Sequence, residues 1–174
     1  MSVSDKPVVI SCALTGAATT RKQCPVLPYT PIEIAAEAQR AYEAGATIVH
    51  IHAREDDGKP SWNADIFKRI KEETEKRCPI LINFSTGGIG NTIEDRTEQL
   101  KVAPPHIAAL NMGTMNYAIY SSEKKKFHME LIFENPFRDI ITALTRMQEH
   151  GVIPEMECFD AGHICNAEPL IDMG

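Results

Sequence analysis

The sequence predicts an α/β protein in which helices cover a parallel β-sheet. Short apolar runs rich in Val and Ile alternate with longer segments in which apolar residues recur at helical spacing. The short runs are nearly all apolar, as expected for strands that are buried on both faces. Five predicted strands occupy residues 7–15, 46–52, 78–85, 105–113 and 152–160. This alternation is typical of an open doubly wound sheet or of a (β/α) barrel, and topology alone leaves both open.

The segments between the predicted strands carry helix start and stop signals. Helices are predicted over residues 30–45, 63–77, 92–102 and 133–151, and residues 163–174 begin a fifth. In the first helix Thr30 is the expected N-cap, Glu33 completes a capping box, and Gly45 suits the C-terminal end. In the fourth helix Asn135 is the expected cap, because it directly precedes Pro136.

Length and composition favour a single folded domain over residues 1–174. Apolar residues make up 43% and charged residues 24% of the chain, and these shares argue against disorder. The net charge of -6 at pH 7 offers no basic surface to nucleic acid or to an anionic membrane, so neither is an expected partner.

The N-terminus and the cysteines favour a cytoplasmic protein. The first residues lack the basic and apolar sections of a signal peptide, and no apolar run approaches the roughly 18 residues that a membrane span needs. The five cysteines are an odd number at irregular spacings without a CxxC pair. Reduced, buried thiols are therefore expected rather than disulfides or a zinc site.

Two histidines lie two positions apart near the end of the second predicted strand. Because successive strand side chains point to opposite faces, His50 and His52 share a face, with Cα atoms about 6.5–7 Å apart. Both imidazoles could meet one ion at about 2.0–2.1 Å, and a zinc ion held in this way polarises a carbonyl or stabilises an enolate. The alternative is a pair of hydrogen-bonded histidines without a metal.

Polar residues and glycines follow the third and fourth predicted strands. The candidates for substrate binding are Ser85, Thr86, Gly87, Gly88, Asn111 and Thr114. The two glycines let backbone amides approach a ligand, and the hydroxyls can hold a carboxylate or a phosphate. A turn between a strand and a helix also needs glycine, and Asn111 and Thr114 could shape the turn after the fourth strand.

The fifth predicted strand carries two carboxylates, Glu155 and Glu157, on one face. Inside a barrel, unpaired carboxylates are costly and are usually kept for a cation, a basic partner or proton transfer. At a solvated edge the pair would have no such meaning. Inside a barrel, we predict Glu155 and Glu157 to be catalytic.

Six motifs together resemble the β-keto acid cleavage enzymes, a family whose best-known member acts on 3-keto-5-aminohexanoate. The motifs are SCALTGAATTR, TPIEIAAEA, EAGATIVHIHAREDDGKPS, INFSTGG, ALNMGTMN and VIPEMECFDAG. They span the whole chain, and their combination is far more specific than any one of them. The resemblance implies a (β/α)8 TIM barrel, of which this chain holds about the first five βα units.

The resemblance also implies an enzyme with a divalent metal, usually zinc, that converts a β-keto acid and acetyl-CoA into acetoacetate and a new acyl-CoA. His50 and His52 match the family's two histidine ligands, and Ser85 and Thr114 match positions that help to hold the keto acid. The glutamate that completes the family's metal site, a catalytic arginine and an acidic residue belong to a later part of family chains that this sequence does not contain.

Two features depart from the family pattern. Ala18 occupies the position where some members carry an acidic residue toward an amino-bearing substrate, so a substrate without that amino group is expected. Five βα units also leave strand edges unpaired, so a longer polypeptide, a second copy in a homo-oligomer or another chain is expected to cover them. The alternative functions are a catalytically incomplete truncated barrel with weak metal binding at most, and a binding module without a metal.

Overall fold

A five-stranded parallel sheet forms the centre of the molecule in a computed structural model that describes residues 7–174. The strands lie in the order β1, β2, β3, β4, β7, and each is parallel to its neighbours. Their bounds are Ser11–Ala13 (β1), Ile48–Ile51 (β2), Leu81–Phe84 (β3), Ile107–Asn111 (β4) and Ile153–Glu157 (β7). The five predicted strands are confirmed, although each is shorter than predicted.

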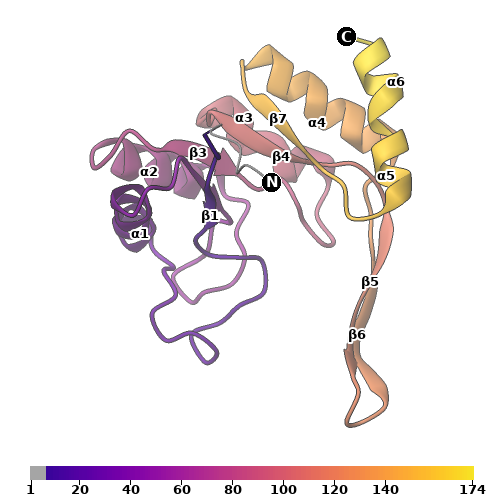
Figure 1. Cartoon of the computed structure of the whole chain (residues 1–174), viewed down its shortest axis with the longest axis horizontal. Helices are drawn as coiled ribbons and strands as arrows, with labels where there is room; N and C mark the ends of the chain where they lie inside the picture. The colour runs from indigo at the N-terminus through magenta and orange to yellow at the C-terminus, as the bar shows by residue number, and fades with distance from the viewer. Residues whose placement is uncertain (1–6) are drawn as a thin grey trace, which may run out of the picture.

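Helices follow the strands along the chain. Their bounds are Pro31–Glu43 (α1), Ala64–Glu75 (α2), Ile93–Val102 (α3), Phe137–Glu149 (α4), Ala161–Cys165 (α5) and Ala167–Asp172 (α6). Figure 1 shows α1 to α4 in chain order around the sheet, with β1 and β7 as its two edge strands. The fold is therefore that of the (β/α)8 barrel class with five βα units present, as predicted.

The helix ends test the capping predictions. Thr30 Oγ1 accepts a hydrogen bond from the Glu33 amide at 3.3 Å, and the Glu33 carboxylate accepts one from the Thr30 amide at 2.9 Å, so the predicted capping box is confirmed. The prediction for Asn135 is wrong. Pro136 occupies the N-cap of α4 and makes no side-chain capping bond. The buried side-chain amide of Asn135 is bonded to Arg96 and Gly113 instead.

Two apolar clusters hold the helices on the sheet. The first joins α1 and α2 to β2 and β3, and in it the rings of Phe67 and Phe84 meet edge to face at 4.8 Å. The second joins α3 and α4 to β4, and Met112 and Met147 are completely buried in it. Both clusters lie between helices and sheet, so the polar ends of the strands remain available for a site.

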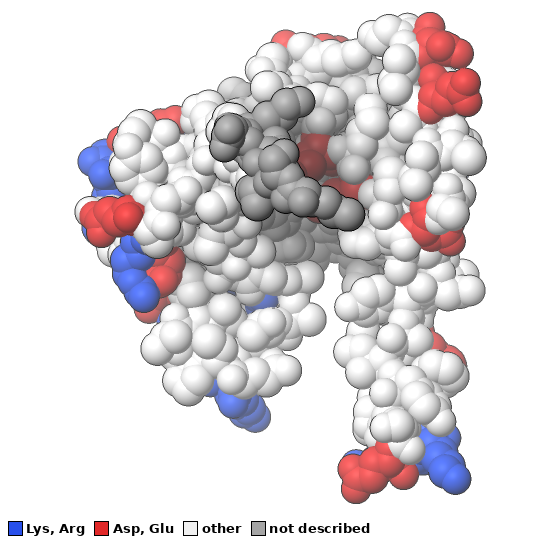
Figure 2. Space-filling model, viewed as in Figure 1, with Lys and Arg blue, Asp and Glu red and all other residues white. Residues whose placement is uncertain are grey.

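An antiparallel hairpin between β4 and α4 was not predicted. It pairs β5, Met115–Ser121, with β6, Lys126–Phe133, and projects from the body of the molecule with acidic and basic side chains at its tip (Figures 1 and 2). Asn111 and Thr114 suit a turn after the fourth predicted strand, and a polar stretch with three lysines hides the strand alternation around the hairpin tip.

The structure also tests the expectations of buried thiols and of a chain without a membrane-spanning helix. All five cysteines are free, but only Cys78 is buried: Cys12 and Cys24 are partly exposed and Cys158 and Cys165 are exposed, so the expectation of buried thiols is confirmed for Cys78 alone. Within residues 7–174, no helix combines the length and the apolar character that a bilayer span requires.

Candidate metal and substrate site

The polar residues picked out in the sequence lie at the carboxyl ends of the parallel strands. His50 lies in β2 and His52 directly follows this strand, and their Nε2 atoms approach to 3.2 Å. Two ligands of a tetrahedral ion, each about 2.0–2.1 Å from it, would be about 3.3 Å apart. The same separation lets one neutral ring donate a hydrogen bond to the other, which is the alternative arrangement without a metal. Thr15, at the end of β1, fixes the backbone of His52 by accepting from its amide at 2.8 Å and donating to its carbonyl at 2.9 Å.

Two carboxylates from β7 lie beside His50, whereas His52 is outside this group of three. Ligand atoms of His50, Glu155 and Glu157 all lie within 4.8 Å of one another, and the three side chains are half-buried. Asn83 is aligned with His50 across the β2–β3 pairing, and its Nδ2 donates a hydrogen bond to Glu155 Oε2. The buried Asn83 therefore connects the histidine strand with the carboxylate strand.

The electrostatics of this cluster suit a cation. Burial, and then the charges of His50 and Arg54, lower the pKa of His52 to about 4. Burial also lowers the pKa of His50, against the opposing effects of Glu155 and Asn83. Both imidazoles are therefore neutral at pH 7, which is the form that binds metals.

The pKa of Glu157 is shifted in the opposite direction. Burial, and then the nearby charge of Glu155, raise the pKa of Glu157 to about 7. Two close, half-buried carboxylates repel each other, and a cation between them would relieve that repulsion. Two imidazole nitrogens with carboxylate oxygens form a donor set that fits zinc and also manganese, cobalt or nickel.

The loop after β3 holds the first group of candidate substrate residues. Ser85 Oγ accepts from the Gly87 amide at 3.2 Å, so the Ser85 hydroxyl proton remains free to donate. Thr86 differs, because its buried hydroxyl donates to the Ala109 carbonyl at 2.5 Å. A Cβ added to Gly88 would lie 2.7 Å from Arg96 Cδ, so a close approach of side chains requires glycine there.

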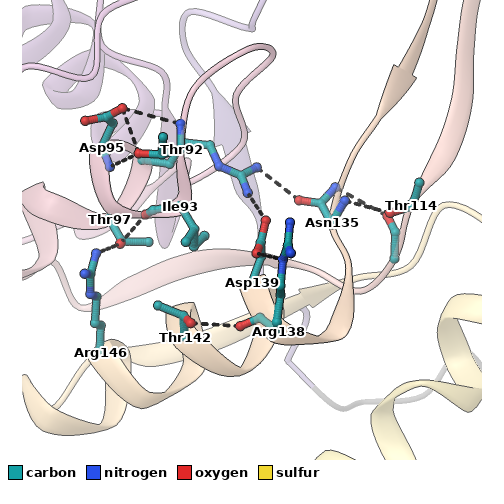
Figure 3. A network of polar contacts seen from close by, with 12 residues as sticks. Thr92, Ile93, Asp95, Thr97, Thr114, Asn135, Arg138, Asp139, Thr142 and Arg146 are labelled. Carbon is teal, nitrogen blue, oxygen red and sulfur yellow. Dashed lines mark hydrogen bonds and ion pairs between the residues drawn. The ribbon is translucent and has the colours of Figure 1, made fainter.

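The loop after β4 holds the second group. Asn111 is buried at the end of β4, and Thr114 Oγ1 accepts from the Asn135 amide at 2.8 Å (Figure 3). The Asn135 side chain donates to the Gly113 carbonyl at 3.3 Å and accepts from Arg96 Nη1 at 3.1 Å. The Thr114 hydroxyl proton, like that of Ser85, is thus left free to donate.

Several residues that shape this site were not anticipated. Trp62 Nε1 donates to the Gly87 carbonyl at 3.1 Å, and the buried ring of His163 packs so closely on Gly113 that a Cβ there would lie 2.4 Å from it. Arg96 and Asn135 join the two substrate loops. Each acts across a long stretch of sequence, so no local pattern could have identified it.

Known proteins resemble the chain over nearly its whole length. Residues 7–174 match the family model described as beta-keto acid cleavage enzyme. The chain is 35% identical to a 3,5-dioxohexanoate:acetyl-CoA acetone transferase of Paraburkholderia graminis, over 97% of this chain and 59% of the relative. It is 38% identical to a 3-keto-5-aminohexanoate cleavage enzyme of Fusobacterium nucleatum, over 90% of this chain and 54% of the relative. The chain thus spans little more than half the length of these relatives.

A third relative and a solved structure agree with this picture. The chain is 32% identical to a 3-oxoadipate:acetyl-CoA acetyltransferase of Cupriavidus necator, over 97% of this chain and 56% of the relative. The ternary complex of ObcA with a C4-CoA adduct and oxalate shares the fold with a TM-score of 0.67 at 23% identity, over 86% of this chain and 34% of that one. The six sequence motifs, the family model and the curated relatives all agree, and the chain belongs to the β-keto acid cleavage enzyme family.

Proposed function

We propose that the chain supplies the metal and keto acid site of an enzyme that exchanges acyl groups between a β-keto acid and acetyl-CoA. The exchange balances, because the acetyl group moves from sulfur to the α-carbon of the keto acid while the acid's own acyl group moves to the CoA sulfur. The products are acetoacetate and a new acyl-CoA. The observation that carries the proposal is the approach of the two imidazoles to 3.2 Å beside Glu155 and Glu157.

His50 and His52 would hold the divalent ion, with zinc as the first candidate. A divalent ion bound there would supply a Lewis acid that polarises the substrate ketone. Glu155 and Glu157 offer carboxylate oxygens within reach of His50, so this chain itself contains candidates for a third ligand. Asn83 would orient Glu155 as an outer-shell partner.

The remaining candidate residues would bind the keto acid and move its proton. Ser85 and Thr114 each have a hydroxyl proton that is free to donate, and these protons suit the substrate carboxylate. Of Glu155 and Glu157, the carboxylate that does not bind the ion would accept the α-proton. Asn111, Gly87 and Gly88 would line the same pocket, and Thr86 would support it through its bond to β4.

Two further proposals concern the chemical class of the keto acid and the cellular compartment of the protein. Ala18 is an exposed apolar residue, so we expect a β-keto acid without an amino group at that position. Acetyl-CoA as the second substrate and five free cysteines among the described residues fit a cytoplasmic enzyme.

A catalytically incomplete barrel that retains metal binding is the alternative, and the edge strands favour it. Ile10 next to β1 and Ile153 in β7 expose 52% and 64% of their surfaces. Further βα units or a second copy of the chain in a homo-oligomer would have to cover these edges.

Zinc content and acetoacetate formation from a β-keto acid and acetyl-CoA separate these proposals. The chain should bind about one zinc ion, and His50→Ala and His52→Ala should lose it, whereas His150→Ala on the exposed end of α4 should keep it. Turnover that the two site variants abolish supports the enzyme. Zinc binding without turnover supports the incomplete barrel, and a wild type that binds no zinc contradicts both.

A further inference from the structure

The buried side chain of Arg96 packs against one of the loops that carry the candidate substrate residues and reaches the other through Asn135. It extends from α3, is 2% exposed, and its Cγ and Cδ atoms pack against Gly88 in the loop after β3. Its Nη1 donates to Asn135 Oδ1 at 3.1 Å, and Asn135 in turn bonds Gly113 and Thr114 in the loop after β4. One guanidinium thus connects two segments that the chain itself connects only through α3 and β4.

The hydrogen bonding of Arg96 is poor for a buried cation. Its Nη2 lies 3.8 Å from Asp139 Oδ2, and its Nε has no hydrogen-bond partner within residues 7–174. Asp139 is shared with the exposed Arg138, whose Nε lies 3.2 Å from Asp139 Oδ1 (Figure 3). A buried charge with so little compensation stabilises a fold weakly, and an apolar side chain of similar volume often serves packing as well.

The contacts on either side of Arg96 determine the direction of two hydroxyl groups. The backbone amide of Asn135 donates a hydrogen bond to Thr114 Oγ1, and the backbone amide of Gly87 donates one to Ser85 Oγ. Both hydroxyl protons are therefore left to donate elsewhere. A shift of either loop would change the distance between these two donors, and catalytic sites tolerate displacements of only about 0.5 Å.

We propose that Arg96 is a positioning residue that sets the distance between the two substrate loops, and hence between the Ser85 and Thr114 hydroxyls. The inference rests on the proposed function for its consequence in catalysis, but its structural part can be tested without turnover. The substrate class that needs this spacing is a β-keto acid, whose carboxylate can accept two hydrogen bonds.

Hydrogen exchange of the wild type and three variants tests the structural part. Arg96→Met keeps the aliphatic packing against Gly88 and removes the guanidinium, so amide exchange should rise about tenfold or more in residues 111–116 and stay close to that of the wild type in residues 85–90. Asn135→Ala removes only the link to the second loop and should affect residues 111–116 alone. Arg138→Met is the matched control, because Arg138 is the second arginine that pairs with Asp139. It should leave the exchange of both loops unchanged.

Two results would overturn the proposal. One is unchanged exchange in residues 111–116 of Arg96→Met. The other is an increase of equal size in the strands β2 and β3, which would show general destabilisation. If Arg96→Met does not fold, Arg96→Lys takes its place, because an ammonium lacks the planar fork and should loosen the loop after β4.

A kinetic measurement on the active enzyme tests the catalytic part. Arg96→Met should raise KM for the keto acid about tenfold while KM for acetyl-CoA stays unchanged, a division that general destabilisation would not produce. Equal changes in both KM values would contradict it. A wild-type chain without turnover would argue against the proposed function of this chain, whereas the exchange result would still decide the role of Arg96.

Discussion

The two sides of the candidate site are built in opposite ways. On the side formed by β2 and β7, His50, His52 and Glu157 have shifted pKa values, because burial is not matched by protein partners. On the side formed by the loops after β3 and β4, four residues each accept a hydrogen bond from another residue: Ser85, Gly87, Gly113 and Thr114. The first side suits the proposed cation, whereas the second is held in place by bonds within the protein.

The largest effect on zinc affinity is expected from neutralising the two carboxylates of β7. The double variant Glu155→Gln and Glu157→Gln should weaken zinc binding by about 100-fold or more, because losing outer-shell partners alone costs about 10- to 100-fold. Isothermal titration calorimetry measures the change, with Glu168→Gln in α6 as a control outside the cluster. Unchanged affinity would mean that the carboxylates are not part of the metal site.

A smaller effect should follow from Asn83→Ala. This variant removes the hydrogen bond to Glu155 and leaves all proposed ligands in place, so zinc affinity should fall about tenfold. Competition with a coloured chelator gives the dissociation constant. An affinity equal to that of the wild type would show that Glu155 needs no such support.

A substitution in the loop after β3 should lower the free energy of unfolding, with or without zinc. Gly88→Ala places a methyl group 2.7 Å from Arg96 Cδ and 3.0 Å from Trp62 Nε1, and overpacking of this kind costs about 1–3 kcal/mol. Chemical denaturation measures the free energy of unfolding. Gly87→Ala is the matched control in the same loop, because the atoms nearest to its new methyl group would lie at 3.5 Å, an ordinary contact distance. An equal or larger loss for Gly87→Ala would contradict the packing argument.

The capping box of α1 belongs to neither side of the candidate site, and it predicts how stability depends on pH. Backbone hydrogen bonds from Thr30 and Tyr29 lower the pKa of Glu33 to about 2. A carboxylate with a lowered pKa stabilises the fold above its unfolded value and loses that contribution as the pH falls toward 2. Glu33→Gln should therefore flatten part of the acid limb in a series of thermal melts, and an unchanged limb would exclude this contribution.

Local rules predicted the parts of the molecule that depend on local geometry. The two-residue period of a strand was enough to bring His50 and His52 to one face, and the capping signals at Thr30 were decisive because their partners lie within three residues. Asn135 carries a similar local signal, but its side chain bonds Arg96, 39 positions away. Tertiary contacts overrode the local preference there, and the same holds for Trp62 on Gly87.

The central claim is that both imidazoles bind one ion. X-ray absorption at the zinc edge of the zinc-loaded chain tests it most directly. The account predicts two imidazole ligands at about 2.0–2.1 Å together with carboxylate oxygen, and the loss of one imidazole in His52→Ala. A zinc spectrum without imidazole, or one that His52→Ala leaves unchanged, would contradict the account.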